Sequence, residues 1–228
     1  MHDNFDKLQN LLKVRFKNLS ILKLAFYHRS YLNEVKQNLE SNERLEFLGD
    51  AILSMIVSKI LFRMRTSDTE GELTNLRAYM VKTKSLFKAA KNLELGKYLR
   101  LSKGEEIGGG RTNPQLLANT YEALLGAIYL DQGLEKAELV IKQTLLSLFE
   151  KELKMGPPKD AKSNLQEIAQ ERFKKSPIYK ILESKGPDHA KQFVVAVYLQ
   201  GKLLGKGMGS SKQIAEEQAA SQALQRLF

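Results

Sequence analysis

Three carboxylates lie within one short segment of the chain, residues 41–57, which runs on into an apolar stretch. In a helix, Glu43, Glu46 and Asp50 stand at positions i, i+3 and i+7 and therefore share one side. Like charges at helical spacing destabilise a helix by about 0.2–0.5 kcal/mol per pair, so a purely structural helix gains nothing from them. The apolar neighbours predict partial burial, and a buried carboxylate needs a cation or a hydrogen-bond partner. The alternative interpretation is a solvated acidic stripe.

Two further oxygen-bearing side chains, Asn119 and Glu122, lie three residues apart in a strongly apolar helical pattern at residues 115–130. Hydrolysis of a phosphodiester near neutral pH needs a deprotonated water and stabilisation of negative charge on the phosphate oxygens, and a divalent metal supplies both. Mg²⁺ prefers hard oxygen ligands, often one or two carboxylates together with waters. If the two helices pack together, four oxygen donors form a centre suited to metal-dependent nuclease chemistry: Glu46, Asp50, Asn119 and Glu122.

The composition excludes some kinds of metal site and indicates a cellular compartment. The 228 residues include no cysteine, which excludes disulfides and thiolate metal sites and fits a reducing compartment. The three histidines, His2, His28 and His189, lie far apart in the sequence and argue against a histidine zinc site. The N-terminus lacks the pattern of a signal peptide, and no apolar run approaches the ~20 residues of a membrane span. We expect a cytoplasmic protein with no membrane association.

The charge balance indicates an anionic partner. The formal net charge is +10, and nucleic acid is the leading partner for such a basic protein. Residues 1–153 carry 23 Lys and Arg against 19 Asp and Glu, whereas residues 154–228 carry 13 against 7. The C-terminal third is therefore the more basic part of the chain.

Residues 1–153 are predicted to be all-α. Apolar residues recur at the helical period, and no alternating strand pattern interrupts them. His28 and Arg29 fall between helices, where a histidine caps or packs more often than it catalyses. The glycine-rich segment 103–111 is interpreted as a flexible connector. The main helices are expected at about residues 42–65, 73–81, 85–93, 115–130 and 135–153.

A second, smaller domain is predicted after a Gly-Pro-Pro cluster. This cluster lies within residues 154–159, which are interpreted as a linker. In residues 160–228, the periodicity of apolar residues predicts an α+β domain with elements in the order α-β-β-β-α. Its first helix is expected at 161–173 and its strands at 178–183, 192–199 and 202–208. The predicted fold is thus an all-α helical domain of residues 1–153 followed by a small α+β domain.

Several motifs match one known family in the same order along the chain. Residues 42–50, with the sequence NERLEFLGD, resemble the ribonuclease III signature, and residues 70–78 and 121–131 resemble two later stretches of that family. The C-terminal region is similar to a double-stranded-RNA-binding domain, with matches at residues 186–189 and 215–220. The resemblance to bacterial ribonuclease III covers nearly the whole chain.

The resemblance implies a homodimeric endoribonuclease that cuts both strands of double-stranded RNA with Mg²⁺, for which Mn²⁺ can substitute. It implies 5′-phosphate and 3′-hydroxyl ends with short 3′ overhangs, and processing of structured precursor rRNA and mRNA. Phe47 corresponds to an aromatic residue at the family's dimer interface. Catalysis is assigned to Asp50 and Glu122, and the family's metal ligands fall on Glu46, Asp50, Asn119 and Glu122.

Position 119 departs from the family pattern, which has an aspartate there. An amide keeps a carbonyl oxygen and the side-chain size but loses a negative charge, so it attracts Mg²⁺ less strongly. Asn119, engineered or natural, is therefore expected to weaken or abolish cleavage. Two other interpretations are a non-cleaving double-stranded-RNA-binding protein that retains the nuclease fold, and an acidic helix bundle with an RNA-binding tail.

The second domain is expected to bind the RNA rather than to cut it. Such domains read the minor groove of A-form RNA and the phosphates across the intervening major groove. Ser210 and Gln213 stand where relatives usually have lysine, which predicts weaker electrostatic binding than is usual in the family. By resemblance, four residues contact RNA: Gln166 and Gln170 at one minor groove, His189 at the next, and Lys212 at the phosphates.

Overall fold

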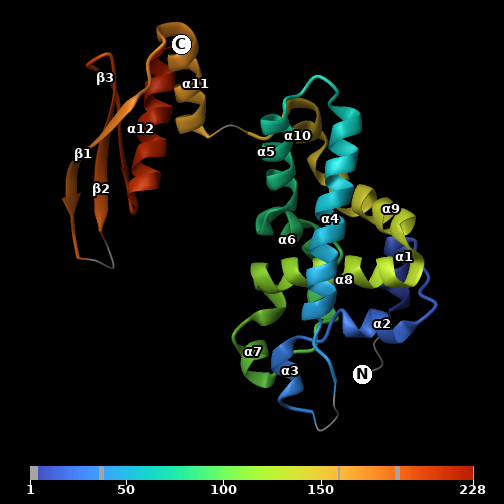
Figure 1. Ribbon diagram of the computed structural model, residues 1–228. Helices are drawn as coiled ribbons and strands as arrows, with labels where there is room; N and C mark the ends of the chain where they lie inside the picture. Colours follow the sequence, from blue (N-terminus) through green and yellow to red (C-terminus); the bar gives the residue numbers. More distant parts are fainter. Residues whose placement is uncertain (1–4, 36–38, 159, 188–190, 228) are drawn as a thin grey trace. The chain divides into compact units, whose positions relative to one another are not determined.

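The chain folds as two units (Figure 1), and the computed structural model describes its residues 5–35, 39–158, 160–187 and 191–227. The first unit is Met1–Pro157 and the second is Pro158–Phe228, so the division falls inside the predicted linker. Of the residues predicted to bind RNA, His189 lies outside the described ones.

The first unit has the all-α fold that the sequence predicts. None of the helices that the structure describes is both long and apolar enough to cross a membrane. Short 3-10 helices occupy Leu95–Lys97, Gly110–Thr112 and Leu146–Phe149. The α-helices are α1 (Asp6–Leu12), α2 (Leu19–Leu24), α3 (Arg29–Leu32), α4 (Glu43–Met64), α5 (Glu70–Val81), α6 (Thr83–Asn92), α7 (Lys103–Ile107), α8 (Pro114–Gln132), α9 (Leu134–Thr144) and α10 (Glu150–Met155).

Helix α8 runs through the core of the first unit. Asn113 caps it, because its side-chain oxygen accepts hydrogen bonds from two backbone N–H groups of the first turn, and Pro114 suits the first helical position. Gly133, with a φ of 84°, ends the helix. Most side chains between residues 117 and 128 are buried, so a polar group on this stretch needs a specific reason to be there.

Helix α4 crosses α8 at a pair of glycines (Figure 1). A Cβ atom on Gly49 of α4 would lie 1.8 Å from the carbonyl oxygen of Glu122. A Cβ atom on Gly126 of α8 would lie 2.3 Å from the carbonyl oxygen of Leu45. The two backbones therefore touch, and only glycine leaves room for this approach. Because Gly49 directly precedes Asp50, the crossing carries that carboxylate towards α8.

Residues 135–153, expected as one helix, form α9, a 3-10 helix and α10. The break follows Thr144, whose hydroxyl donates to the carbonyl of Val140 at 2.7 Å, and Ser147 bonds the carbonyl of Gln143 in the same way at 2.7 Å. Hydroxyls that bond the carbonyl four residues earlier bend a helix. The expectation of a continuous helix was therefore wrong.

The glycine-rich segment 103–111 is helical rather than an open connector. It contains α7 and the start of the 3-10 helix Gly110–Thr112. Nη1 of Arg111 donates to the carbonyl oxygens of Gly96 and Leu99 at 2.9 and 3.0 Å, which ties the segment to the preceding turn. This long-range anchor is a tertiary contact, which the local glycine pattern does not reveal.

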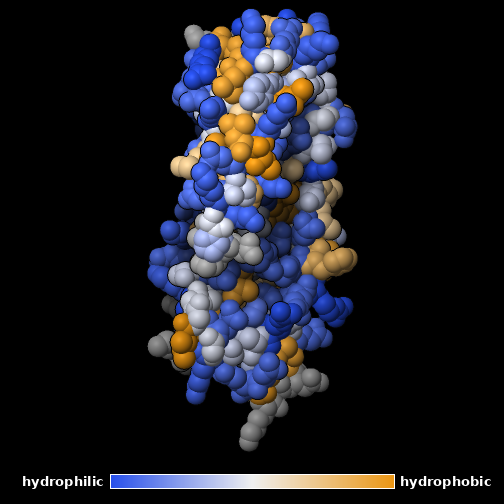
Figure 2. Space-filling view, turned by 90° about the vertical axis from the view of Figure 1, so that its left-hand side faces the viewer, coloured by the Kyte–Doolittle hydropathy of each residue, from blue (hydrophilic) through white to orange (hydrophobic). Residues whose placement is uncertain are grey.

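The second unit has the predicted α+β fold. Helix α12 packs on β2 and β3, and α11 packs on α12 (Figure 1), over a core of Leu165, Val197, Ala219, Ala220 and Ala223. On the face shown in Figure 2, hydrophobic side chains form small patches between polar ones. The elements are α11 (Ala161–Phe173), the antiparallel strands β1 (Ile178–Lys185), β2 (Gln192–Leu199) and β3 (Lys202–Gly209), paired in that order, and α12 (Lys212–Leu227).

Candidate active site

A pocket of about 610 Å³ lies where α4 passes α8. All four predicted metal ligands line it, so folding brings together two pairs of polar side chains that are far apart in the sequence. The full lining comes from both helices and from the segments that precede α3 and α4: His28, Arg29, Asn42, Glu43, Glu46, Phe47, Asp50, Gln115, Leu116, Asn119, Thr120 and Glu122.

Burial and neighbouring negative charges raise the pKa of two carboxyl groups in this pocket, Glu122 and Glu46. Burial, together with the charges of Asp50 and Glu46, raises the pKa of Glu122 to about 8. Burial and the charge of Glu43 raise the pKa of Glu46. A hydrogen bond from Asn119 opposes this rise, because it favours the ionised form of Glu46. The pocket therefore holds carboxyl groups whose simultaneous ionisation is unfavourable without a cation.

Three carboxylates of the pocket form no ion pair within the described residues. These are Glu46, Asp50 and Glu122, whereas Glu43 pairs with Arg29 at 3.8 Å. Asp50 is exposed, but Glu46 and Glu122 are half-buried, and partly buried negative charge is costly unless it is paired or binds a metal. The pocket is therefore suited to take up a cation.

The donor atoms fit a hard divalent cation. They are oxygens of three carboxylates and one amide, the ligand type that Mg²⁺ prefers. In the part of the chain that the structure describes, no three His, Cys, Asp or Glu side chains are grouped closely enough to enclose an ion by themselves. Mg²⁺ usually keeps several waters and binds one or two carboxylates, so an open arrangement suits it.

Asn119 is held between two neighbours. Its Oδ1 accepts a hydrogen bond from Nε2 of Gln115, one helical turn earlier, at 2.7 Å. Glu46 lines the same pocket from α4, and its contact with the Asn119 side chain favours the ionised form of Glu46. The hydroxyl of Thr83 donates to Oε1 of Gln115 at 3.4 Å. Sequence reasoning missed Gln115, although its i,i+4 spacing from Asn119 was an available signal.

His28 caps α3 and lies at the edge of the pocket. Its Nδ1 accepts a hydrogen bond from the backbone N–H of Ser30 at 3.3 Å. Burial lowers the pKa of His28, so the ring is mostly neutral near pH 7. Arg29, with its side chain 74% exposed, places a cation at the mouth of the pocket.

Phe47 and the described residues predicted to bind RNA lie on the surface. Phe47 is 80% exposed beside the pocket. Gln166 and Gln170 are exposed one turn apart on α11. Lys212 is exposed as the first residue of α12.

Comparison with known proteins accounts for both units. A family model described as Ribonuclease-III-like matches residues 18–148, and a model described as a double-stranded RNA binding motif matches residues 161–227. Ribonuclease 3 of Pelotomaculum thermopropionicum is 45% identical over 225 residues, which cover 98% of this chain and 93% of that protein. The chain belongs to the ribonuclease III family. Ribonuclease 3 of Geobacillus kaustophilus is likewise 46% identical over 224 residues, or 98% of this chain and 91% of that protein.

Solved ribonuclease III structures resemble the first unit. The nuclease domain of ribonuclease III from Campylobacter jejuni aligns with a TM-score of 0.60 and 38% identity, covering 64% of this chain and 99% of that one. A second structure of the same domain, at 2.2 Å resolution, gives the same score and identity, with 97% of that chain covered. Ribonuclease III enzymes cleave double-stranded RNA and generally depend on a divalent metal, so this ribonuclease III is an endoribonuclease whose second unit is a double-stranded-RNA-binding motif.

Proposed function

We propose that this ribonuclease III uses Mg²⁺ to cleave both strands of double-stranded RNA, leaving 5′-phosphate and 3′-hydroxyl ends with short 3′ overhangs. Its proposed substrates are structured precursor rRNA and mRNA in the cytoplasm. The observation that carries the proposal is the convergence of Glu46, Asp50 and Glu122 in one pocket without a protein counter-charge among the described residues. We assign residues 1–153 to the nuclease domain, 154–159 to the linker and 160–228 to the RNA-binding domain.

Carboxylates of this pocket, together with waters, would hold the cation, with Asn119 beside them. When bound, Mg²⁺ or Mn²⁺ stabilises charge on the phosphate oxygens and lowers the pKa of water. Asp50 and Glu122 orient the reacting groups from opposite helices. Arg29 at the pocket mouth attracts the phosphate backbone and keeps Glu43 paired, which limits the negative charge that the RNA meets.

Cleavage of a long RNA duplex with Mg²⁺, with Mn²⁺ or with a chelator tests this function. We expect fragments with 5′-phosphate ends and short 3′ overhangs with either metal, and intact duplex with the chelator. Asn119→Asp is expected to reach the same rate at lower Mg²⁺, because it restores a negative charge to the pocket. Tight duplex binding without cleavage at any Mg²⁺ or Mn²⁺ concentration would support the non-cleaving alternative instead.

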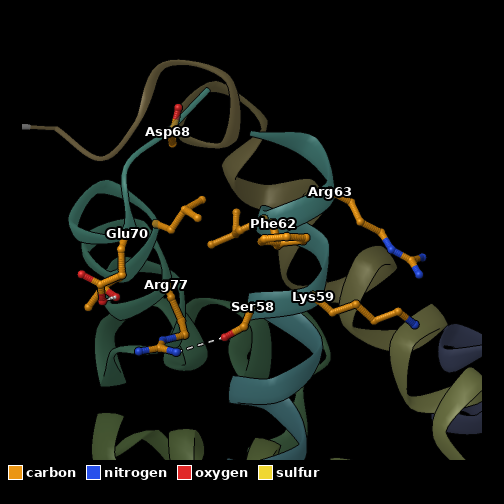
Figure 3. A pocket seen from close by; sticks show the side chains of 10 residues that line it. Ser58, Lys59, Phe62, Arg63, Asp68, Glu70 and Arg77 are labelled. Atoms are coloured by element: carbon orange, nitrogen blue, oxygen red, sulfur yellow. Dashed lines mark hydrogen bonds between the residues drawn. The ribbon is translucent and has the colours of Figure 1, made fainter. Parts of the chain in front are cut away.

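The exposed hydrophobic residues of α4 support a homodimer. Phe47, Met55 and Phe62 are 80%, 44% and 72% exposed, and their spacing places them on one side of the helix. A groove of about 840 Å³ lies between α4 and α5 (Figure 3). Phe62 lies on its α4 side, Arg63 is turned away from it, and Arg77 is bonded to Ser58 at 3.1 Å. We propose a two-fold dimer in which Phe47 of each copy enters this groove of the other.

Phe47→Ala is expected to convert the dimer to a monomer. Two symmetric aromatic contacts of about 2 kcal/mol each correspond to roughly a thousandfold weaker dimer Kd. Light scattering across a dilution series measures this change. Ile107→Ala, at a residue that is 88% exposed on α7, is the matched control and should leave the dimer intact. A Phe47→Asp variant that still forms the dimer at the wild-type concentration would exclude Phe47 from the interface.

The second unit is proposed to bind the RNA duplex. Gln166 and Gln170, on one side of α11, are proposed to face a minor groove, and Lys212 is proposed to meet phosphates at the positive end of α12. His189 is proposed to reach the next minor groove, as the sequence predicts.

A further inference from the structure

An amide pair connects α8 to the carboxylates of α4. Gln115 and Asn119 are four residues apart on α8, and Nε2 of Gln115 donates to Oδ1 of Asn119 at 2.7 Å. On its other side, Gln115 accepts a hydrogen bond from the hydroxyl of Thr83 in α6 at 3.4 Å. In this arrangement the amide nitrogen of Gln115 faces Asn119 and its oxygen faces Thr83, since only the nitrogen of an amide can donate.

The polarity of this contact determines the orientation of the next amide. Oδ1 of Asn119 faces Gln115, so its Nδ2 is the end left for Glu46, which lines the same pocket. An ionised carboxylate only accepts hydrogen bonds, and Nδ2 is the donor that the Glu46 contact requires. A carboxylate at position 119 has no such donor and would repel Glu46. The amide at this position therefore makes a contact that the family's aspartate cannot make in its ionised form.

We propose that Gln115 is a positioning residue that holds the Asn119 amide with its nitrogen towards Glu46, so that Asn119 orients this carboxylate and does not itself bind the cation. The inference rests on the proposed function, since it concerns the same metal site. In this arrangement Asn119 acts through Glu46 and is not itself a ligand of the cation. Second-layer partners of this kind orient metal ligands and raise metal affinity.

Mn²⁺ binding to the RNA-free full chain, followed by electron paramagnetic resonance, tests the direction of the effect. Gln115→Leu is expected to weaken Mn²⁺ binding by roughly two- to tenfold, the equivalent of one lost hydrogen bond. If Oδ1 of Asn119 were a metal ligand, the same change would free that oxygen and strengthen binding, or leave it unchanged. Either of those results would overturn the proposal. Gln143→Leu, at an exposed glutamine on α9 that donates to the carbonyl of Leu11, is the matched control.

A double-mutant cycle tests whether Gln115 acts through Asn119. In an Asn119→Ala background, Gln115→Leu is expected to have no further effect on Mn²⁺ affinity. Additive losses would contradict the positioning role. The proposed function fails in a different way: wild-type protein that binds no Mn²⁺ and cleaves no duplex would refute the nuclease centre as a whole.

The metal-free protein provides a second measurement. The side-chain NH₂ protons of Asn119 are expected to exchange slowly with solvent in the wild type and faster in Gln115→Leu, as seen by NMR. They should stay protected when Mg²⁺ is added, since the amide keeps its orientation. Rapid exchange of these protons in the wild type would overturn the proposal irrespective of metal binding.

Discussion

Glu122→Gln is expected to reduce the rate of duplex cleavage by at least about a thousandfold, within the range that positioned acid–base and metal-binding groups contribute. The change keeps the size of the side chain and removes one of the four carboxylates that line the pocket. Single-turnover cleavage with saturating protein measures it, because this assay separates the chemical step from RNA binding. Duplex binding in the presence of Ca²⁺ should remain close to that of the wild type.

The stability of the same variant tests the electrostatics of the pocket. The pKa of Glu122 is raised from 4.5 to about 8 in the folded protein, so the folded state binds more protons than the unfolded state between these values. Without metal, wild-type stability should therefore fall as the pH rises through this window. Glu122→Gln lacks this loss and should be the more stable protein at pH 9.

Chemical denaturation with a chelator, at pH 5 and at pH 9, measures the difference. We expect the wild type to lose on the order of 1–3 kcal/mol relative to Glu122→Gln between the two values. If ionisation of Glu122 costs no folding free energy, the difference in stability between the two proteins should be the same at both pH values. That outcome would remove the reason for assigning a cation to this pocket.

Gly49→Ala is expected to destabilise the nuclease unit by about 3 kcal/mol or more, which lowers Tm by roughly 6–12 °C for a chain of this size. The added Cβ would lie 1.8 Å from the carbonyl oxygen of Glu122, so the two helices must separate. The gain in helix propensity, about 1 kcal/mol, is too small to offset this overlap. Calorimetry of the first unit's transition provides the measurement.

Gly71→Ala is the matched control for this prediction. Gly71 lies near the start of α5, where an added Cβ would meet nothing within 4 Å. We expect Gly71→Ala to leave Tm unchanged or to raise it slightly, because alanine favours the helix. Equal melting temperatures for Gly49→Ala and the wild type would mean that the backbones of α4 and α8 are not in contact at Gly49.

The sequence predicted those parts of the site that follow a local pattern. Glu46 and Asp50 share a side because of helical spacing, and the apolar run around Asn119 and Glu122 indicates a buried helix. The prediction that these two helices pack together came from the family resemblance. Nothing in the local pattern marks Gly49 as the contact point, because a glycine inside a helix is read only as a weak helix former.

Some of the remaining features depend on contacts between distant parts of the chain. Gln115 is exposed on α8, and its spacing from Asn119 is local, but its contact with Thr83 of α6 exists only in the folded chain. The anchoring of Arg111 arises in the same way, from hydrogen bonds to the carbonyls of Gly96 and Leu99. The break within residues 135–153 instead follows local hydroxyl contacts, which the hydrophobic pattern does not register. The predicted fold class was confirmed because it depends on hydrophobic periodicity alone.

The glycine contact between α4 and α8 also separates the stability of the fold from the geometry of the active centre. The closest approach of the two helices that carry the carboxylates is set by backbone against backbone rather than by side chains. Conservative replacements of buried residues elsewhere in the unit, such as Leu86 or Val140, can then change how tightly the fold is held without changing the distance across the active centre. Substitutions in the hydrophobic core are therefore expected to disturb the active centre less than substitutions at the glycine contact.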